Sequence, residues 1–151
     1  MGELKIEGIY PLAYIQMLTG GRTERVFART ASHFNQANAD NDVEDLASVT
    51  LEIEGGVTGS LAIGRIGAAS HPDIGEIKLH IVGSEGSLVI SEARPEVRAY
   101  YRNQPTNEFP SRRVANDLNY QLMEDFGNAI DNDTTTILDA QVGRDIAAAV
   151  E

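Results

Sequence analysis

The sequence predicts an α+β domain: an open, mainly antiparallel sheet of about six strands with helices on one face. Its 151 residues amount to about one domain, and a hydrophobic fraction of 42% is typical of a globular chain. Strand-like segments follow one another through the middle of the chain and are joined mostly by short turns, which makes them antiparallel. Helical patterns lie at both ends, where they can cover only one face of such a sheet.

The first expected helix covers residues 10–19. Pro11 suits its first turn because no N–H donor is needed there, and the glycine pair at 20–21 ends it. The apolar residues of one helix face recur at helical spacing: Leu12, Ile15 and Leu18. Tyr10 therefore stands where the helix begins, either as a packing residue that seats the helix or as a group that reacts with a substrate.

The strands follow the first helix. Segment 46–54 alternates strictly, with its apolar side chains on one face and its polar ones on the other. Gly55 and Gly56 then favour a tight hairpin turn, while 35–45 is a polar loop rich in turn residues. The other expected strands are 24–34, 57–66, 76–83, 87–91 and 96–102.

One face of this sheet is expected to carry small, uncharged side chains opposite the large aliphatic ones. They are Ser48, Thr50, Thr58, Ser60, Ala62 and Gly64. A flat face of small residues allows a second sheet to approach closely. The pattern favours a homo-oligomer that forms through this open face, and the alternative is an ordinary threonine-rich exposed sheet.

Two helices close the chain. Segment 114–130 is amphipathic, and Asn116 or Asp117 can cap it. Asp139 caps the last helix, whose pattern still runs at Glu151 without a glycine cap or a proline stop. We therefore expect the sequence to be one piece of a longer protein, the alternative being a frayed natural terminus.

The charge of the chain excludes several classes of partner. A formal net charge of −11 repels nucleic-acid phosphates and anionic membrane surfaces. No apolar run approaches the roughly 20 residues of a membrane span. The N-terminus lacks the apolar core of a signal peptide, so a cytoplasmic location is the default expectation. The absence of cysteine excludes disulfides and thiolate metal sites.

The residues alone give few candidates for chemistry. The three histidines lack the spacing of metal ligands, and no metal site is expected. His71 lies in the loop "ASHPDIG" near Asp73, and a loop with a histidine and a carboxylate can contact a polar ligand. The alternative is a surface loop without a role. From spacing alone, the chain is an α+β domain without a self-sufficient catalytic site.

Four stretches, taken in order, carry a family resemblance. They are "GIYPLAYIQMLTGG", "EDLASVTLEIEGGVTGSLAIG", "KLHIVGSEGSLVIS" and "FGNAIDNDTTTILDAQVGRDIAAAVE". They are spread along nearly the whole chain, from Gly8 to Glu151, and resemble the C-terminal domain of the Gfo/Idh/MocA oxidoreductases, the family of glucose–fructose oxidoreductase and inositol dehydrogenase. The third stretch is similar to the "G-x-x-G-x-L" hairpin of that family.

The resemblance implies a parent enzyme of two domains that acts on a sugar or polyol. An N-terminal Rossmann domain would bind NAD or NADP, and residues 1–151 would form the C-terminal domain for substrate binding and oligomerisation. This sequence contains neither a G-x-G-x-x-G motif nor the E-K-P motif with the family's lysine. The chain alone is therefore expected to hold no dinucleotide and to be inactive.

The resemblance also implies site residues. Tyr10 matches the position of a histidine or tyrosine that donates or accepts a proton. The family's aspartate four residues earlier corresponds to Ile6, and its Tyr-Asp pair corresponds to Gly75 and Glu76. Tyr10 is therefore the expected catalytic residue, with His71 and Glu76 as substrate-binding candidates. The missing aspartate leaves a second reading open, a noncatalytic domain that binds a sugar-like ligand or dimerises.

Overall fold

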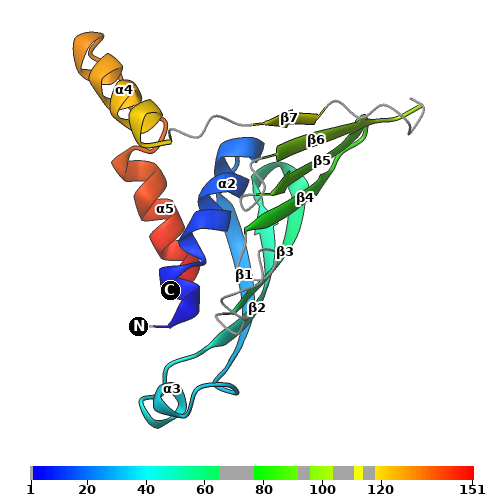
Figure 1. Ribbon diagram of the computed structural model, residues 1–151, viewed down its shortest axis with the longest axis vertical. Coiled ribbons are helices and arrows are strands. Elements are labelled where there is room, and N and C mark those ends of the chain that lie inside the picture. The colour runs from blue at the N-terminus through cyan, green and yellow to red at the C-terminus, as the bar shows by residue number, and fades with distance from the viewer. Residues whose placement is uncertain (1, 65–76, 92–95, 104–110, 114–117) are drawn as a thin grey trace. The chain divides into compact units, whose positions relative to one another are not determined.

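The computed structural model describes residues 2–64, 77–91, 96–103, 111–113 and 118–151 (Figure 1). They fall into two compact units, one formed by Met1–Ala68 with Thr135–Glu151 and the other by Ala69–Thr134. Both units contain antiparallel strands, and helices occur in both. The α+β class expected from the sequence is therefore confirmed.

The first unit is built on a three-stranded antiparallel sheet in the order β1-β2-β3. Its strands are β1 (Thr23–Ala31), β2 (Leu46–Ile53) and β3 (Val57–Gly64). Its helices are α1 (Glu3–Ile6), α2 (Ile9–Thr19), α3 (Gln36–Asp40) and α5 (Ala140–Val150), with a 3-10 turn at Glu54–Gly56. The turn between β2 and β3 needs its glycines, because Gly55 and Gly56 have φ angles of 82° and 80°.

The core of this unit lies on one face of β2. The alternate residues of the strand are almost fully buried there: Ala47, Val49, Leu51 and Ile53. Helices α1, α2 and α5 cover this face and add Leu4, Leu12 and Ile146 to the same cluster. Burying an aliphatic side chain of this size stabilises a fold by about 1.5–3 kcal/mol, so the alternation seen in the sequence decides which face the helices cover.

The opposite face of the sheet is open in the described part of this unit. Its small residues are exposed as the sequence predicts: Ser48, Thr50, Thr58, Ser60, Ala62 and Gly64. Phe27 pairs with Thr50 across β1 and β2 and is 71% exposed. Arg25 and Glu52 form an ion pair on neighbouring strands of the same face. This surface, including Phe27, is called the open face below.

Asp45 ties the loop after β1 to the start of β2. Its buried carboxylate accepts backbone hydrogen bonds from His33, Phe34 and Asn35 at 3.0, 2.8 and 2.9 Å. Burial by itself raises the pKa of Asp45, but the three N–H donors outweigh it and hold the pKa below its usual value. The loop is therefore fixed by an ionised carboxylate.

A second polar tie joins the beginning of β1 to the end of β2. The Arg22 guanidinium donates to the Glu54 carboxylate at 2.6 Å, and the Arg22 backbone N–H donates to the other carboxylate oxygen at 3.0 Å. These hydrogen bonds lower the pKa of Glu54, and the carboxylate raises the pKa of Arg22. Because both side chains are partly exposed, this ion pair adds little to the free energy of folding. Its main effect is on the register in which β1 pairs with β2.

The second unit contains a four-stranded antiparallel sheet in the order β4-β5-β6-β7 and one long helix. The elements are β4 (Lys78–Val82), β5 (Gly86–Ser91), β6 (Glu96–Tyr101), β7 (Ser111–Arg113) and α4 (Leu118–Asp131). The Gly83 backbone N–H donates to the Gly86 carbonyl at 2.8 Å and closes the hairpin expected at "GSEG". A side chain at position 86 would meet the Tyr100 carbonyl at 2.1 Å, so glycine is required there.

The structure contains three short elements that the sequence did not predict. Helices α1 and α3 and strand β7 have only 4, 5 and 3 residues, which is too short for a helical or alternating pattern to be recognised. The strands also form two sheets, of three and four strands, in place of one sheet of about six. Among the helices that the structure describes, none is long and apolar enough to cross a membrane.

Candidate functional site

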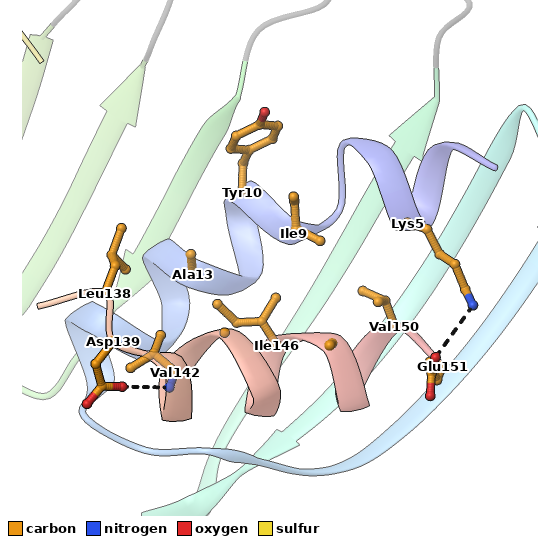
Figure 2. Close-up of a pocket in the computed structure, with 12 residues that line it drawn as sticks. Lys5, Ile9, Tyr10, Ala13, Leu138, Asp139, Val142, Ile146, Val150 and Glu151 are labelled. Atoms are coloured by element: carbon orange, nitrogen blue, oxygen red, sulfur yellow. Dashed lines mark hydrogen bonds and ion pairs between the residues drawn. The ribbon is translucent and has the colours of Figure 1, made fainter. Parts of the chain in front are cut away.

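Tyr10 lies in the first turn of α2. Its backbone N–H donates to the Glu7 carbonyl at 3.3 Å, and Pro11 behind it is buried. Gly8 permits the tight turn from α1 into α2, because a side chain there would come within 2.3 Å of the Leu4 carbonyl. The Tyr10 side chain is 52% exposed, and it points away from α5 (Figure 2). The phenol is thus held at the surface of the unit by a fixed backbone.

Below Tyr10 runs an apolar groove between α2 and α5, with a cavity volume of about 510 Å³. Its apolar walls come from both helices and from a residue two positions before α5: Ile9, Ala13, Leu138, Val142, Ile146 and Val150. Tyr10 forms part of its lining. This surface is called the α2–α5 groove below.

The charged residues of the α2–α5 groove lie at its ends (Figure 2). At one end the Lys5 ammonium lies 4.0 Å from the Glu151 carboxylate, and Figure 2 shows it directed toward Glu151 and not toward Tyr10. At the other end Asp139 accepts a hydrogen bond from the Val142 backbone N–H at 2.9 Å and caps α5. The groove is therefore an uncharged surface with a phenol at its edge.

The groove is the part of the site that sequence reasoning missed. Its two walls come from helices more than a hundred residues apart, so no local spacing connects them. A signal was present in α5, where Gly143 and Ala147 stand four residues apart and both line the groove. Residues four apart share one face of a helix, so this pair marked a face of small residues that had no assigned use.

Tyr10 is the expected site residue that falls within the described part of the chain. His71, Gly75 and Glu76 lie outside the described residues. Ile6, at the position of the family's aspartate, is the last residue of α1 and is half-buried. Among the described residues, no cluster of three or more His, Cys, Asp or Glu side chains could hold a metal ion.

The sequence comparison identifies one family. The family described as the GFO/IDH/MocA C-terminal domain matches residues 4–89. The match covers most of α1, all of α2 and every strand of the first unit, and it extends over β4 and most of β5. It spans more than half of the chain. No curated protein sequence matches the chain.

Several solved structures have a similar fold. UDP-N-acetylglucosamine 3-dehydrogenase from Acidithiobacillus ferrooxidans is 21% identical with a TM-score of 0.76, covering 94% of this chain and 43% of that one. An oxidoreductase from Agrobacterium radiobacter in complex with NAD+, L-tartaric acid and magnesium is 17% identical with a TM-score of 0.72, covering 99% and 46%. An inositol dehydrogenase homologue from Azotobacter vinelandii, complexed with NADH and myo-inositol, is 23% identical with a TM-score of 0.56, covering 71% and 26%. The chain thus spans less than half the length of each of these proteins, and at these identities the likeness shows the fold.

Proposed function

The chain belongs to the GFO/IDH/MocA C-terminal domain family, and on that premise we propose that it is the substrate-binding and oligomerisation domain of an NAD(P)-dependent oxidoreductase. The parent enzyme oxidises or reduces a sugar or polyol. The observation that carries the proposal is Tyr10, a half-exposed phenol at the start of α2 and at the edge of an open groove. That placement leaves its hydroxyl accessible to a substrate.

The dinucleotide would be held by a second domain. The residues of this chain do not fit the pyrophosphate, because its described part has no glycine-rich turn that opens onto a helix N-terminus, the donor set that binds such a group. The nicotinamide of the bound cofactor supplies the hydride acceptor or donor. This chain contributes the wall of the site that faces the substrate.

Tyr10 would transfer the proton. When a carbinol carbon is oxidised, its C–H bond breaks as a hydride and its hydroxyl must lose a proton, for which a positioned base lowers the barrier. In the oxidation, the deprotonated (phenolate) oxygen of Tyr10 accepts that proton and becomes a phenol, and in the reverse direction this phenol returns the proton to the carbonyl oxygen. A phenol is a poor base at neutral pH unless a cation lowers its pKa. In the proposed enzyme that cation is the lysine of the second domain.

Two of the similar structures support the substrate class. One is described as a dehydrogenase of UDP-N-acetylglucosamine, and another was solved with myo-inositol, so both concern molecules with several ring hydroxyl groups. We assign His71 and Glu76 to contacts with such hydroxyl groups, since an imidazole and a carboxylate can both hydrogen-bond to them. Both residues lie outside the described part of the chain, so the assignment of Glu76 rests on the resemblance and that of His71 on its loop with Asp73.

Replacing Tyr10 in the full-length oxidoreductase tests the proposal. Tyr10→Phe keeps the ring and removes the hydroxyl, and we expect kcat with NAD or NADP and a polyol substrate to fall by about 10²- to 10⁴-fold. Tyr120→Phe is the matched control, because Tyr120 is another exposed tyrosine, located on α4. Turnover that is unchanged in Tyr10→Phe removes Tyr10 from the mechanism.

A second candidate function follows from Ile6. The family's aspartate is replaced there by an apolar, half-buried side chain, which favours a noncatalytic domain that binds a sugar-like ligand. The coding sequence upstream of residue 1 distinguishes the two functions. A dinucleotide-binding domain with the E-K-P motif supports the enzyme, and an upstream region without that motif supports the binding domain.

A further inference from the structure

Two aromatic side chains stand exposed on the loop between β1 and β2, which covers residues 32–45 and includes α3. Phe34 is 61% exposed, and His33 is exposed beside it. Their ring centroids lie 6.2 Å apart, and the angle between the ring planes is 89°. An exposed phenylalanine forgoes the stabilisation that its burial would bring, so the stability of the first unit does not explain these two rings. His33 and Phe34 are called the ring pair below.

The backbone under the ring pair is held firmly by Asp45. Burying an ionised carboxylate is costly unless it is hydrogen-bonded. The buried carboxylate of Asp45 accepts hydrogen bonds from the N–H groups of His33, Phe34 and Asn35. The side chain of Asn35 in turn caps α3, which follows directly. The backbone that carries the two rings is therefore fixed without a ligand, and such preorganisation lowers the entropy cost of binding.

The geometry of the ring pair suits a sugar ring. A pyranose has a face of C–H groups and an edge of hydroxyl groups. Its C–H face can pack on the negatively polarised face of the Phe34 ring. The imidazole of His33 stands perpendicular to that ring, so it can hydrogen-bond to a hydroxyl group at the edge of the sugar. The two side chains thus offer the apolar and the polar contact that such a ring needs.

The loop that carries the ring pair lies at the end of the sheet from which the expected substrate residues depart. Ala31, the last residue of β1, pairs with Leu46, and Leu46 pairs with Gly64, the last residue of β3. The segment with His71 and Glu76 follows Gly64 in the sequence. Since neighbouring strands are about 4.8 Å apart, the two segments leave the sheet within about 10 Å of each other.

The turn that carries Tyr10 lies at the same end. The Leu4 backbone N–H, in α1, donates to the side chain of Glu44 at 3.2 Å, so the end of the loop contacts the helix that precedes α2. A side chain at Gly8 would come within 2.9 Å of Ile63, one residue before the end of β3. The reacting phenol and the ring pair therefore belong to one end of the first unit, at a separation that a substrate of two linked rings can span.

We propose that the ring pair forms a second sugar subsite of the oxidoreductase, which binds a ring linked to the one that reacts. This inference rests on the proposed function and narrows its substrate class to a saccharide of at least two rings. Charge favours an uncharged saccharide over a nucleotide sugar. The chain carries a net charge of −11, and Asp40 and Asp42 are exposed on the same loop, so a diphosphate would be repelled.

A single indole in the loop tests binding directly. The chain contains no tryptophan, so Phe34→Trp keeps an aromatic face and adds the only indole fluorophore. We expect maltose to change its fluorescence in a saturable way and uridine to leave it unchanged. Tyr101→Trp is the matched control, because Tyr101 is another exposed aromatic residue, at 54%, at the end of β6. Its indole should not respond to maltose.

Asp45 acts in this subsite as a positioning residue, and the same indole tests that role. Adding Asp45→Asn to Phe34→Trp should lower the fluorescence anisotropy of the indole, because the loop is loosened. It should also raise the maltose concentration at half-saturation about tenfold, as the loss of a hydrogen bond to a charged group predicts. Adding Asp45→Asn to Tyr101→Trp should leave the anisotropy unchanged. Equal losses of anisotropy at both positions would indicate general unfolding and contradict the positioning role.

Turnover by the full-length oxidoreductase connects the subsite with the reaction. Phe34→Ala should raise KM for the disaccharides maltose and lactose about tenfold, because a stacked ring is lost. It should leave kcat, and the KM for glucose, unchanged. An indole at position 34 that ignores maltose overturns the subsite, as does a KM for disaccharides that Phe34→Ala does not change. A response to uridine in place of maltose identifies a nucleotide sugar and overturns the saccharide.

Failure of the proposed function has a different signature. A wild-type full-length protein that neither binds nor uses a dinucleotide contradicts the oxidoreductase, whereas the maltose response of the indole is measured on the 151-residue chain without any cofactor.

Discussion

Asp45 shows how much one residue decides about a loop. Its carboxylate receives the backbone N–H groups of three consecutive residues, His33, Phe34 and Asn35. A buried N–H without an acceptor costs the full desolvation of that group, so replacing the carboxylate should loosen the entire connection between β1 and β2. No sequence pattern predicted this tie, because its donors are backbone amides, which every residue except proline carries.

The pKa of Asp45 predicts how this tie depends on pH. Because the folded state holds the pKa below the value near 4 of an unfolded aspartate, the contribution is complete above pH 4. It is lost as the pH falls through the folded pKa. We expect Asp45→Asn to lower the midpoint of thermal unfolding by several degrees at pH 7. Urea unfolding of the wild type and of Asp45→Asn at pH 7 and pH 3 should show that the difference between their free energies of unfolding is smaller at pH 3. A difference that does not depend on pH would show that the charge of Asp45 is not involved.

The helix that contains Tyr10 shows how far single residues predict local structure from the sequence. Pro11 and the glycine pair Gly20–Gly21 predicted a helix over residues 10–19, and α2 begins one residue earlier and ends at the same residue. This is possible because caps and breakers are local signals. The exposure of Tyr10 could not be predicted, since it depends on how α2 lies against α5.

At the scale of elements, α5 forms one wall of the α2–α5 groove and has an N-terminal cap. The Asp139 side chain accepts a hydrogen bond from the Val142 backbone N–H at 2.9 Å, as the sequence predicts for a helix cap. Helix α4 and strands β2 to β6 also follow expected segments, because each has enough residues to show a period. Strand β7 follows two prolines and has three residues, too few to alternate.

The cap of α5 can be tested directly. Asp139→Ala should destabilise the first unit by about 1 kcal/mol, the typical value of an N-cap hydrogen bond, whereas Asp139→Ser keeps an acceptor and most of the stability. Asp131→Ala removes the same charge from the last residue of α4, where it caps no helix N-terminus. Thermal unfolding followed by circular dichroism compares the three variants. Equal midpoints for Asp139→Ala and Asp131→Ala would contradict the capping role.

At the scale of the whole molecule, the open face of the first unit is the feature that points beyond a single chain. The residues of this face could be predicted from the alternation of apolar and polar residues in the sequence, because side chains two residues apart share one face of a strand. Phe27 was not singled out, although it is 71% exposed and pairs with Thr50 on this face. An exposed aromatic ring among small side chains is suited to anchor a second sheet. The proposed homo-oligomer accordingly forms through this face.

Phe27→Asp tests that assembly. A carboxylate facing its symmetry mate across a two-fold interface is repelled, so the wild-type chain should be an oligomer by light scattering and Phe27→Asp a monomer. Phe34→Asp is the matched control, since Phe34 is also exposed, at 61%, in the loop after β1. A wild-type chain that remains monomeric at high concentration argues against the interface. Equal loss of association in both variants points to a general effect of charge.

The α2–α5 groove and the division of the strands into two sheets depend on contacts between distant parts of the sequence. The groove joins residues near both ends of the sequence, such as Ile9 and Val150, and a periodicity argument relates only residues within one element. The same limit explains why one sheet of about six strands was expected. Hairpins predict which strands are neighbours, but they do not predict that β3 and β4 belong to different sheets.

In the order β1-β2-β3, β1 and β3 are the two edge strands of the sheet of the first unit, and they differ in composition. Strand β1 carries Glu24, Arg25 and Arg29, whereas β3 has no charged residue and no proline. Charges and prolines on border strands discourage unwanted pairing with other chains. Taken by itself, the first unit is therefore protected against aggregation along β1 and open to it along β3, so a partially unfolded chain would begin to misassociate at residues 57–64.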